Sequence, residues 1–514
     1  MPSCSAPLIL AINNHYYLLF IMKELLMKIN LTRHPLILIL TCMALFILSA
    51  ATAPALASTT KAEEFVAKLK SHYQNTQSIK TFSLKYHFLN KQYRDNDYWD
   101  YQTPNRVMSQ RMVEVDLVKK HFYDNDILYY SGGRLYDRAQ FQNDTESLFY
   151  EKSTSIFGKA FINRGMDNFD RFIRYTVMNV DFLAVRPLLK EDDIAAKITL
   201  VQNPKKEITT LTHKVADDSI VEYAFSHHPL QLRSINKKPE QALYIYDDYQ
   251  TTRGLTFARS LHSYYGDSAA PAYIKFIDQF DITEQVDPGK LKLPTGYGPE
   301  LPIGDGVLVS KEIASDLYLV TDSSASRNSL FKVNGDKIMV FGASGYTRLA
   351  NKTIKLINKQ FPNKKITSVY VTHPHGHQIA GLKAYVDKGI EILADEYSIE
   401  AIKAYPDFVN DINKFKFRTI EHKQVIDGSH FYVLENMHSK RQSFVHFKDS
   451  GIIFQADFLH IPFDNTIAKV IPNYTRTFID FVRNKQLKVN RIVGHRNNNN
   501  ISVEVMNKTY NAMM

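Results

Sequence analysis

The sequence predicts an α+β protein of two folded domains: an N-terminal curved antiparallel β-sheet, then a C-terminal sandwich with sheets at its centre and helices outside. Three observations predict this fold class. At 514 residues, the chain is too long for one ordinary hydrophobic core. From Phe82 to about Ile282, many segments alternate apolar and polar residues with the period of two that marks half-buried strands. Beyond a stretch rich in proline and glycine, helical and strand patterns alternate to the end.

The first 57 residues have the features of a targeting segment. Lys28 and Arg33 precede an almost wholly apolar run over 36–48, and the small-x-small pattern Ala55-Leu56-Ala57 follows. The run is about 13 residues long, short of the ~20 that span a bilayer, so we expect a signal peptide cleaved after Ala57. Met27 would open a signal peptide of ordinary length, and we expect translation to start there. The alternative is a retained membrane segment that uses both apolar stretches near the N-terminus.

Composition and charge narrow the class of protein. The chain is 44% hydrophobic and 23% charged, which is typical of a globular protein and not of a disordered one. Both cysteines, Cys4 and Cys42, precede the expected cleavage site, so any metal in the mature chain must be held by histidine and carboxylate. The net charge of +10 is scattered among acidic residues, which gives no reason to expect nucleic-acid binding. A basic face that binds anionic substrates or the envelope surface is an alternative use of this charge.

The β-rich domain is expected over 58–290. A helical pattern at 61–73 opens it, and further helices are predicted at 166–178 and 180–189. Clear period-two strands are 81–88, 219–225 and 241–246. One exported helix followed by a long, aromatic-rich antiparallel sheet resembles the periplasmic lipoprotein-carrier and lipoprotein-localisation superfamily, over about 62–290. That resemblance implies a sheet wrapped around a hydrophobic cavity for acyl chains. The alternative is a scaffold or a dimer surface.

Residues 288–302, dense in proline and glycine, are predicted to be a linker to a second domain over 303–514. This domain opens with a hairpin-rich segment that contains a turn at Asn334-Gly335. The elements predicted after it are helix 347–360, strand 366–372, helix about 378–387, strand 390–394, helix 398–404, strands 430–436, 443–448 and 452–456, helix 474–486 and strand 489–494.

Three alternating histidines, His373, His375 and His377, lie between a β-branched strand and the start of a helix. Side chains two residues apart on an extended chain point the same way, so His373 and His375 can converge on one ion. Imidazole is a common ligand of zinc and related metals, and a strand end gives it a rigid base. The sequence therefore predicts a metal site nucleated by His373 and His375.

The stretch His373-Pro-His375-Gly-His377-Gln378 resembles the His-x-His-x-Asp-His signature of the metallo-β-lactamase superfamily. The first two histidines match, while His377 stands at the Asp position and Gln378 at the last His position. The family also has an Asp after an early strand, where this chain reads Gly342-Ala-Ser-Gly345. Over about 305–505, the resemblance implies an αββα metallo-β-lactamase-like sandwich.

Three downstream residues match the order of the family's other ligands. His438 follows a strand, Asp457 ends a strand that resembles the one carrying the metal-bridging acid, and His495 ends a Gly-His pair. The resemblance implies a first site of His373, His375 and His438. It also implies that Asp457 bridges to a second ion or accepts a proton. His495, with His377 or Gln378, would complete an altered second site.

These residues lead to one main functional hypothesis. We expect an exported, periplasmic or secreted hydrolase that uses a metal-bound hydroxide on an ester, lactone, thioester or amide, with Asp457 and His377 as catalytic residues. The expected cofactor is zinc, as one or two ions, with iron or manganese as alternatives. A second hypothesis is a non-catalytic metal- or ligand-binding protein of the cell envelope on the same fold. A third has the β-rich domain hold a lipid-like substrate and feed the metal site.

Overall fold

The computed structural model describes residues 61–513, apart from 92–97, 103–105, 130–134, 153–161, 165–167, 191–193, 217–218, 239, 298–299, 344 and 469–470. The expected signal segment, with Met27, Ala57 and both cysteines, lies outside the described residues. Within the described part of the chain, no helix has the length and apolar character needed to cross a bilayer.

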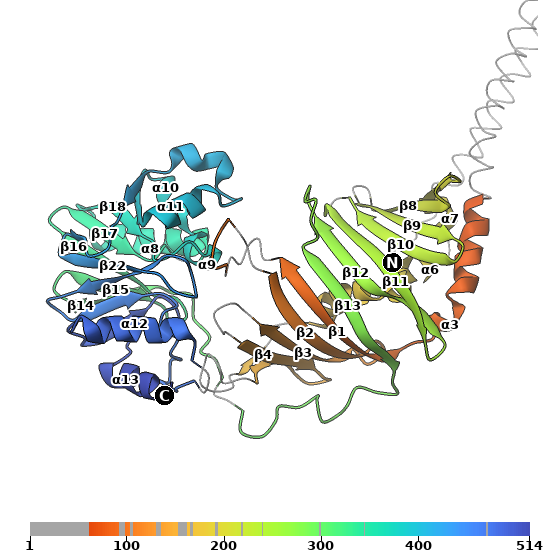
Figure 1. The fold of residues 1–514 in the computed structure, drawn as a ribbon, viewed down its shortest axis with the longest axis horizontal. Coiled ribbons are helices and arrows are strands. Elements are labelled where there is room, and N and C mark those ends of the chain that lie inside the picture. Colours follow the sequence, from red (N-terminus) through yellow and green to blue (C-terminus); the bar gives the residue numbers. More distant parts are fainter. Residues whose placement is uncertain are drawn as a thin grey trace, which may run out of the picture.

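The N-terminal half is built on one antiparallel sheet of thirteen strands, in the order β6-β5-β4-β3-β2-β1-β13-β12-β11-β10-β9-β8-β7 (Figure 1). Residues 61–72 are helical, and α3 (Gln74–Gln77) follows them. The strands are β1 (Thr81–Lys91), β2 (Arg106–Asp116), β3 (His121–Tyr129), β4 (Leu135–Gln142), β5 (Ser147–Glu151), β6 (Ile162–Arg164), β7 (Ile198–Asn203), β8 (Ile208–Ala216), β9 (Ser219–His227), β10 (Leu230–Lys237), β11 (Ala242–Thr252), β12 (Leu255–Tyr265) and β13 (Tyr273–Ile282). β13 is the central strand, and β1 beside it pairs with β2 on its other side.

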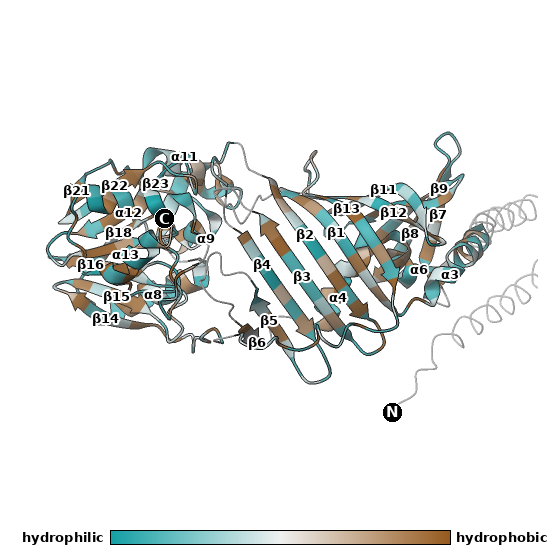
Figure 2. Cartoon of the chain, turned by 60° about the horizontal axis from the view of Figure 1, so that its bottom comes forward, coloured by the Kyte–Doolittle hydropathy of each residue, from teal (hydrophilic) through white to brown (hydrophobic). Residues whose placement is uncertain are grey.

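Alternation along the strands sorts side chains onto the two faces of this sheet, and Figure 2 shows it as alternating bands along several strands. Neighbours Phe122 and Tyr123 on β3 belong to different cores. Phe122 joins a large core that includes Phe172, Phe182 and Leu188 of the helical segment, so helices cover that face. Tyr123 joins a smaller core on the opposite face.

The helical segment that crosses the sheet is more broken than the sequence predicts. In place of two helices at 166–178 and 180–189, it forms α4 (Phe169–Thr176), a 3-10 turn (Val177–Asn179), α5 (Asp181–Ala184), α6 (Arg186–Lys190) and α7 (Ile194–Lys197). Asn168 caps α4 by accepting from the Arg171 N–H. Val180 has an extended backbone, and Pro187 cannot donate to the carbonyl of residue 183, so one continuous helix is excluded.

The segment 288–302 contains no helix or strand among its described residues, apart from an isolated bridge between Ile162 and Glu300. It still packs closely on the N-terminal domain. Leu291, Leu293 and Tyr297 lie against the smaller core of the sheet, and Lys290 pairs with Glu114 of β2. This segment therefore follows the sheet surface.

The C-terminal half contains two sheets with helices outside. The first has seven strands: β14 (Val309–Ala314), β15 (Leu317–Thr321), β16 (Ser329–Asn334), β17 (Lys337–Phe341), β18 (Lys365–Tyr370), β19 (Glu391–Ala394) and β20 (Phe417–Thr419). The second has five: β21 (Val425–Ile426), β22 (Ser429–Leu434), β23 (Gln442–Phe447), β24 (Ile452–Gln455) and β25 (Arg491–Gly494). The helices are α8 (Thr347–Gln360), α9 (Gly376–Ile379), α10 (Leu382–Val386), α11 (Glu396–Lys403), α12 (Asn473–Asn484) and α13 (Val503–Asn511), with a 3-10 helix over Val409–Lys414.

Three cores stack through this half and define its layers. The central core joins Phe341 and Tyr370 of the first sheet to Phe431 and Phe454 of the second. The outer core of the first sheet contains residues of α8, α10 and α11, and that of the second contains residues of α12 and α13. The layers are therefore helix, sheet, sheet and helix.

Several chain segments that leave the strands meet at one edge of this sandwich. β17, β18 and β19 are parallel, so their carboxyl ends lie at the same edge. Ser443 N–H donates to the Thr372 carbonyl across the two sheets, at 2.7 Å. His495, just after β25, donates its N–H to Gln455 at the end of β24, at 2.8 Å. The histidine-bearing loops of both sheets are thereby gathered together.

Candidate metal centre

The loop after β18 carries the three alternating histidines. β18 ends at Tyr370, and α9 begins at Gly376, with His375 in an extended conformation as its N-cap residue. His373 lies in a bend two residues earlier, and both histidines are fully buried. His377 lies in the first turn of α9, and 16% of its side chain is exposed.

Four side chains from three loops converge beside this strand end. The Nε2 of His373 lies 3.1 Å from Nδ1 of His375 and 3.3 Å from Nε2 of His438. Oδ2 of Asp457 lies 3.4 Å from the His373 Nε2 and 3.6 Å from the His438 Nε2. One ligand atom from each of the four residues lies within 4.8 Å of every other, and all four residues are buried.

These spacings fit a single metal ion. Ligands at about 2.0–2.1 Å from a tetrahedral ion are separated from one another by about 3.3 Å. A hydrogen bond between two imidazoles satisfies one pair of these atoms, whereas a cation among them can satisfy all four. Three imidazoles and one carboxylate are borderline and hard ligands with no thiolate, a donor set that suits zinc, iron or manganese.

The protonation state of His375 agrees with a ligand role. Its Nε2 lies 2.9 Å from the Tyr98 carbonyl oxygen, which can only accept, so Nε2 carries the proton and Nδ1 presents its lone pair to His373. Burial, together with the neighbouring histidines, holds the pKa of His375 well below its usual range. His375 is therefore neutral at physiological pH, as a metal ligand must be.

Asp457 is the acid of the cluster. It follows β24 with φ +62°, a left-handed conformation that the short Asp side chain tolerates. Its Oδ2 lies 2.9 Å from His377 Nε2 and accepts from Gln378 Nε2 at 2.8 Å. Burial raises the pKa of Asp457, but hydrogen bonds from His373, His377 and His438 outweigh burial and hold this pKa well below the usual value. The two residues that depart from the signature thus both contact Asp457, and Gln378 presents an amide N–H to it.

His495 lies close by but is not one of the four clustered residues. Its Nδ1 donates to the Asn328 carbonyl at 2.6 Å, which leaves Nε2 without a proton. Nε2 is buried and has no hydrogen-bond partner among the described residues. Burial, then the charge of Arg327, lowers the pKa of His495 to about 3. An orphaned buried nitrogen of this kind is suited to a ligand atom.

Gly342 makes room for His495. It directly follows β17 and has φ +92°. A Cβ at this position would lie 2.5 Å from both Cε1 and Nδ1 of the His495 ring. Only glycine combines this backbone conformation with that close approach.

A segment of the N-terminal half contacts the histidine loop of the site. The sequence did not indicate this contact. Residues 98–102 lie between β1 and β2 and reach the C-terminal half (Figure 1). The Tyr98 carbonyl accepts from His375, and the Tyr98 hydroxyl donates to the Pro374 carbonyl at 3.3 Å. Sequence distance hides such a contact, because Tyr98 and His375 are separated by 277 positions.

Neighbouring residues anchor this segment. Trp99 Nε1 donates to the Asn436 carbonyl at 2.8 Å, and the Lys440 N–H donates to the Trp99 carbonyl at 2.8 Å. Asp100 accepts from Tyr397 at 3.2 Å and from Lys440 Nζ at 3.1 Å. We call residues 98–101 the interdomain clamp. It connects the β-rich domain directly to the second histidine of the metal centre.

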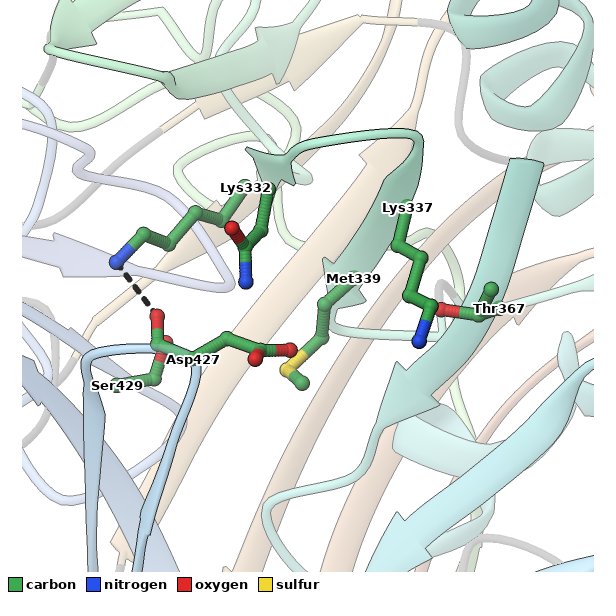
Figure 3. Close-up of a pocket in the computed structure, with 7 residues that line it drawn as sticks. Lys332, Lys337, Met339, Thr367, Asp427 and Ser429 are labelled. Carbon is green, nitrogen blue, oxygen red and sulfur yellow. Dashed lines mark hydrogen bonds between the residues drawn. The ribbon is translucent and has the colours of Figure 1, made fainter. Parts of the chain in front are cut away.

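Elsewhere in the sandwich, a cavity of about 10 Å³ is lined by Lys332, Met339, Thr367, Asp427 and others (Figure 3). It lies near the start of β17 and β18, whereas the histidines follow the end of β18. Lys332 Nζ donates to the Asp427 carbonyl beside it at 2.8 Å. This volume holds about one water, so the cavity cannot take a substrate.

Comparison with known proteins gives similarity in structure only. No protein-family model matches the chain, and no curated protein matches it by sequence. A metallo-beta-lactamase from Hirschia baltica is similar over 40% of this chain and 97% of its own, with 12% identity and a TM-score of 0.32. A metallo-beta-lactamase from Erythrobacter litoralis is similar over 41% of this chain and 98% of its own, with 15% identity and a TM-score of 0.33. The metallo-beta-lactamase FIM-1 from Pseudomonas aeruginosa in its mono-zinc form is similar over 40% of this chain and 94% of its own, with 15% identity and a TM-score of 0.31. At these TM-scores, the functional proposal rests on the residues of this chain.

Proposed function

We propose that the C-terminal domain is a metal-dependent hydrolase whose metal is held by His373, His375, His438 and Asp457. The observation that carries the proposal is the convergence of these four buried side chains, with ligand atoms within 4.8 Å of one another. The likeness of this motif to the metallo-β-lactamase signature supports the same reaction class. A divalent metal in such a site supplies Lewis acidity and lowers the pKa of a water to about 7.

The chain's own residues have defined roles in this proposal. His375 and His438 are buried and close the inner side of the site against solvent. Asp457 Oδ1 is buried and has no hydrogen-bond partner among the described residues, so it is available to accept a proton at the reaction centre. His377 Nε2 lies 2.9 Å from Asp457 Oδ2 on the more open side, where His377 donates to the carboxylate and orients it toward the reaction centre.

Substrate and location are also proposals. We infer a periplasmic or secreted enzyme that acts on an ester, lactone, thioester or amide, with zinc as the expected metal. In the β-rich domain, a cavity of about 200 Å³ beside β11–β13 is lined mainly by polar and charged residues such as Arg253, Arg259 and Asp281. Phe257, Ile277 and Phe280 supply the apolar part of this lining, so the cavity suits a small molecule with both polar and apolar groups.

The decisive experiment measures metal content and turnover together. Full-length protein and His375→Ala are assayed for zinc, iron and manganese by mass spectrometry, and for hydrolysis of a panel of esters, lactones, thioesters and lactams. His422→Ala is the matched control, because His422 bonds to the Val433 carbonyl away from the cluster. We expect the wild type and the control to carry metal and to hydrolyse at least one compound class, and His375→Ala to lose both. Equal metal content and hydrolysis in all three proteins contradicts the proposal.

A non-catalytic metal-binding protein is the second candidate, and one observation favours it. His377 and Gln378 both occupy Oδ2 of Asp457, which restrains that carboxylate. Asp457→Asn distinguishes the two functions. If the wild type binds metal but its turnover on the same panel equals that of Asp457→Asn, the site binds metal without catalysis.

A further inference from the structure

Two arginines are paired backbone to backbone at the edge of the metal centre. Arg327, in the loop before β16, and Arg496, after β25, form an isolated antiparallel bridge. The Asn328 N–H donates to the His495 carbonyl at 2.9 Å, and the Asn497 N–H donates to the Ser326 carbonyl at 3.2 Å. These two bonds flank the arginines, which makes them a non-hydrogen-bonded pair, the kind with the closest side chains. Both side chains therefore leave the same face of the bridge.

Two like charges directly opposite each other destabilise a β pair, so this arrangement needs an explanation. The Arg327 Nη1 is buried and has no hydrogen-bond partner among the described residues. Burial and the charge of Arg496 lower the pKa of Arg327 to about 10. At neutral pH Arg327 is still a cation, and its buried donor is unused. A buried charged donor of this kind is costly unless something pairs with it.

The arginine pair faces the proposed reaction centre. Arg496 Nη1 lies 4.0 Å from Asp457 Oδ1, and His460 Nε2 lies 3.5 Å from the same oxygen. A Cβ at Gly345 would lie 3.3 Å from the Arg327 guanidinium and 3.3 Å from the His377 carbonyl, so Arg327 is adjacent to the histidine loop. Arg496 and His460 retain 31% and 10% side-chain exposure, so this side is open to solvent.

Asp457 cannot neutralise both arginines. Its Oδ2 already accepts from His377 and Gln378, and Oδ1 stays 4.0 Å from Arg496. It would also share its negative charge with any metal in the cluster. Two guanidinium groups on this side of the site therefore share one incompletely matched carboxylate oxygen.

We propose that Arg327 and Arg496 form a binding subsite for an anionic group, a carboxylate, phosphate or sulfate, that belongs to the substrate. Guanidinium groups present paired donors that match these oxyanions in geometry and charge. The assignment of the anion to a substrate rests on the proposed hydrolase function, whereas anion binding at this pair does not.

The test measures anion binding without turnover. Inorganic phosphate and benzoate are titrated by calorimetry into full-length protein, both as purified and after treatment with a chelator, and benzamide serves as the neutral counterpart of benzoate. Arg327→Gln and Arg496→Gln are compared with Arg483→Gln, whose guanidinium packs on Tyr510 on another surface. We expect each of the first two variants to weaken binding of one of the anions by about tenfold or more, with Arg483→Gln unchanged and benzamide unbound. The preferred anion distinguishes a carboxylate from a phosphate or sulfate group.

Three outcomes overturn the proposal: no binding of either anion, equal binding in both arginine variants and wild type, or equal binding of benzamide and benzoate. Arg327→Lys guards against a folding defect, because it keeps the charge but not the paired donors, and its phosphate affinity should lie between those of Arg327→Gln and the wild type. Anion binding that persists in chelated protein and in His375→Ala, without hydrolysis, would separate failure of the hydrolase proposal from failure of the subsite. If the wild-type protein contains metal and hydrolyses a substrate but binds neither anion, the subsite proposal fails and the hydrolase proposal stands.

Discussion

Close packing in the candidate metal centre restricts which residue type can occupy certain positions. The alternation of His373 and His375 on chain expected to be extended was enough to predict that their side chains meet, since residues two apart share a side. The position of His495 depends instead on a glycine 153 positions earlier in the chain, because its ring occupies the space of a Gly342 side chain. No local pattern in the sequence reveals that dependence.

Gly342→Ala should destabilise the protein and displace His495. Alanine at φ +92° is strained, and its Cβ would lie 2.5 Å from two ring atoms of His495. Gly335→Ala is the matched control, because Gly335 has φ +59° but no atom within 4 Å of the added methyl group. We expect Gly342→Ala to lower the free energy of unfolding by at least about 1 kcal/mol more than the control does. Equal losses in chemical denaturation would show that the ring is not confined there.

A buried acid in the N-terminal core makes stability depend on pH. Burial raises the pKa of Asp181 to about 6, although its Oδ1 accepts from the Ala258 N–H at 3.1 Å. The folded state favours the protonated acid, so stability falls as pH rises from about 4 through about 6. Asp181→Asn removes that penalty and should gain roughly 3 kcal/mol at pH 7 relative to pH 4, compared with wild type. Unfolding curves at the two pH values test this, with exposed Asp247→Asn as the control that should not change the difference.

At the scale of elements, sequence periodicity predicted the type and place of many helices and strands. Helix α8 has the predicted bounds of 347–360, and β18 and α12 each lie within two residues of theirs. The predicted helix at about 378–387 is instead two short helices that meet at Gly381, the N-cap residue of the second. Periodicity reports which face of an element is buried, so it cannot report a contact between distant loops. The interdomain clamp and the pairing of Arg327 with Arg496 are both of that kind.

The interdomain clamp should influence metal affinity without touching the metal. Asp100→Ala removes the acceptor for Tyr397 and Lys440 and so loosens the segment whose Tyr98 carbonyl orients His375, although the two hydrogen bonds of Trp99 remain. Loss of such an outer hydrogen bond weakens metal binding by about tenfold or more. Competition titration with a chromophoric chelator measures the change. Asp411→Ala is the control, because Asp411 pairs with Lys383 and Lys414 at a distance from the histidines and should leave affinity unchanged. Equal affinities in the two variants would exclude a role for the clamp.

The whole molecule has separate cores in its two halves. The N-terminal cores contain residues up to Tyr297, and the C-terminal cores begin at Leu308. The halves meet through the segment that follows β13 and through the interdomain clamp. Cores that share no side chains are expected to unfold in separate steps, whereas a ligand stabilises only the part that holds it.

Metal removal should therefore lower one thermal transition and spare the other. A ligand present at a thousand times its dissociation constant adds about 4 kcal/mol, or on the order of 10 °C in a domain of this size. We expect calorimetry of chelator-treated protein to shift the C-terminal transition downward by that order, with the N-terminal transition little changed. His375→Ala should show the low C-terminal transition with or without chelator. A single thermal transition that shifts as a whole on metal removal would contradict independent unfolding of the two halves.

The central pairing of the large sheet sets the order in which the chain can assemble. β1 pairs with β13, and Phe82 meets Ile282 across some 200 intervening positions. On the ribosome, β1 and β2 emerge long before β13, so the middle of the sheet has a temporary open edge that is prone to aggregation. The clamp lies between β1 and β2, so it is synthesised long before His375, which its Tyr98 carbonyl contacts. Slow closure of β1 on β13 therefore delays the final placement of the clamp on His375, while the C-terminal cores can form separately.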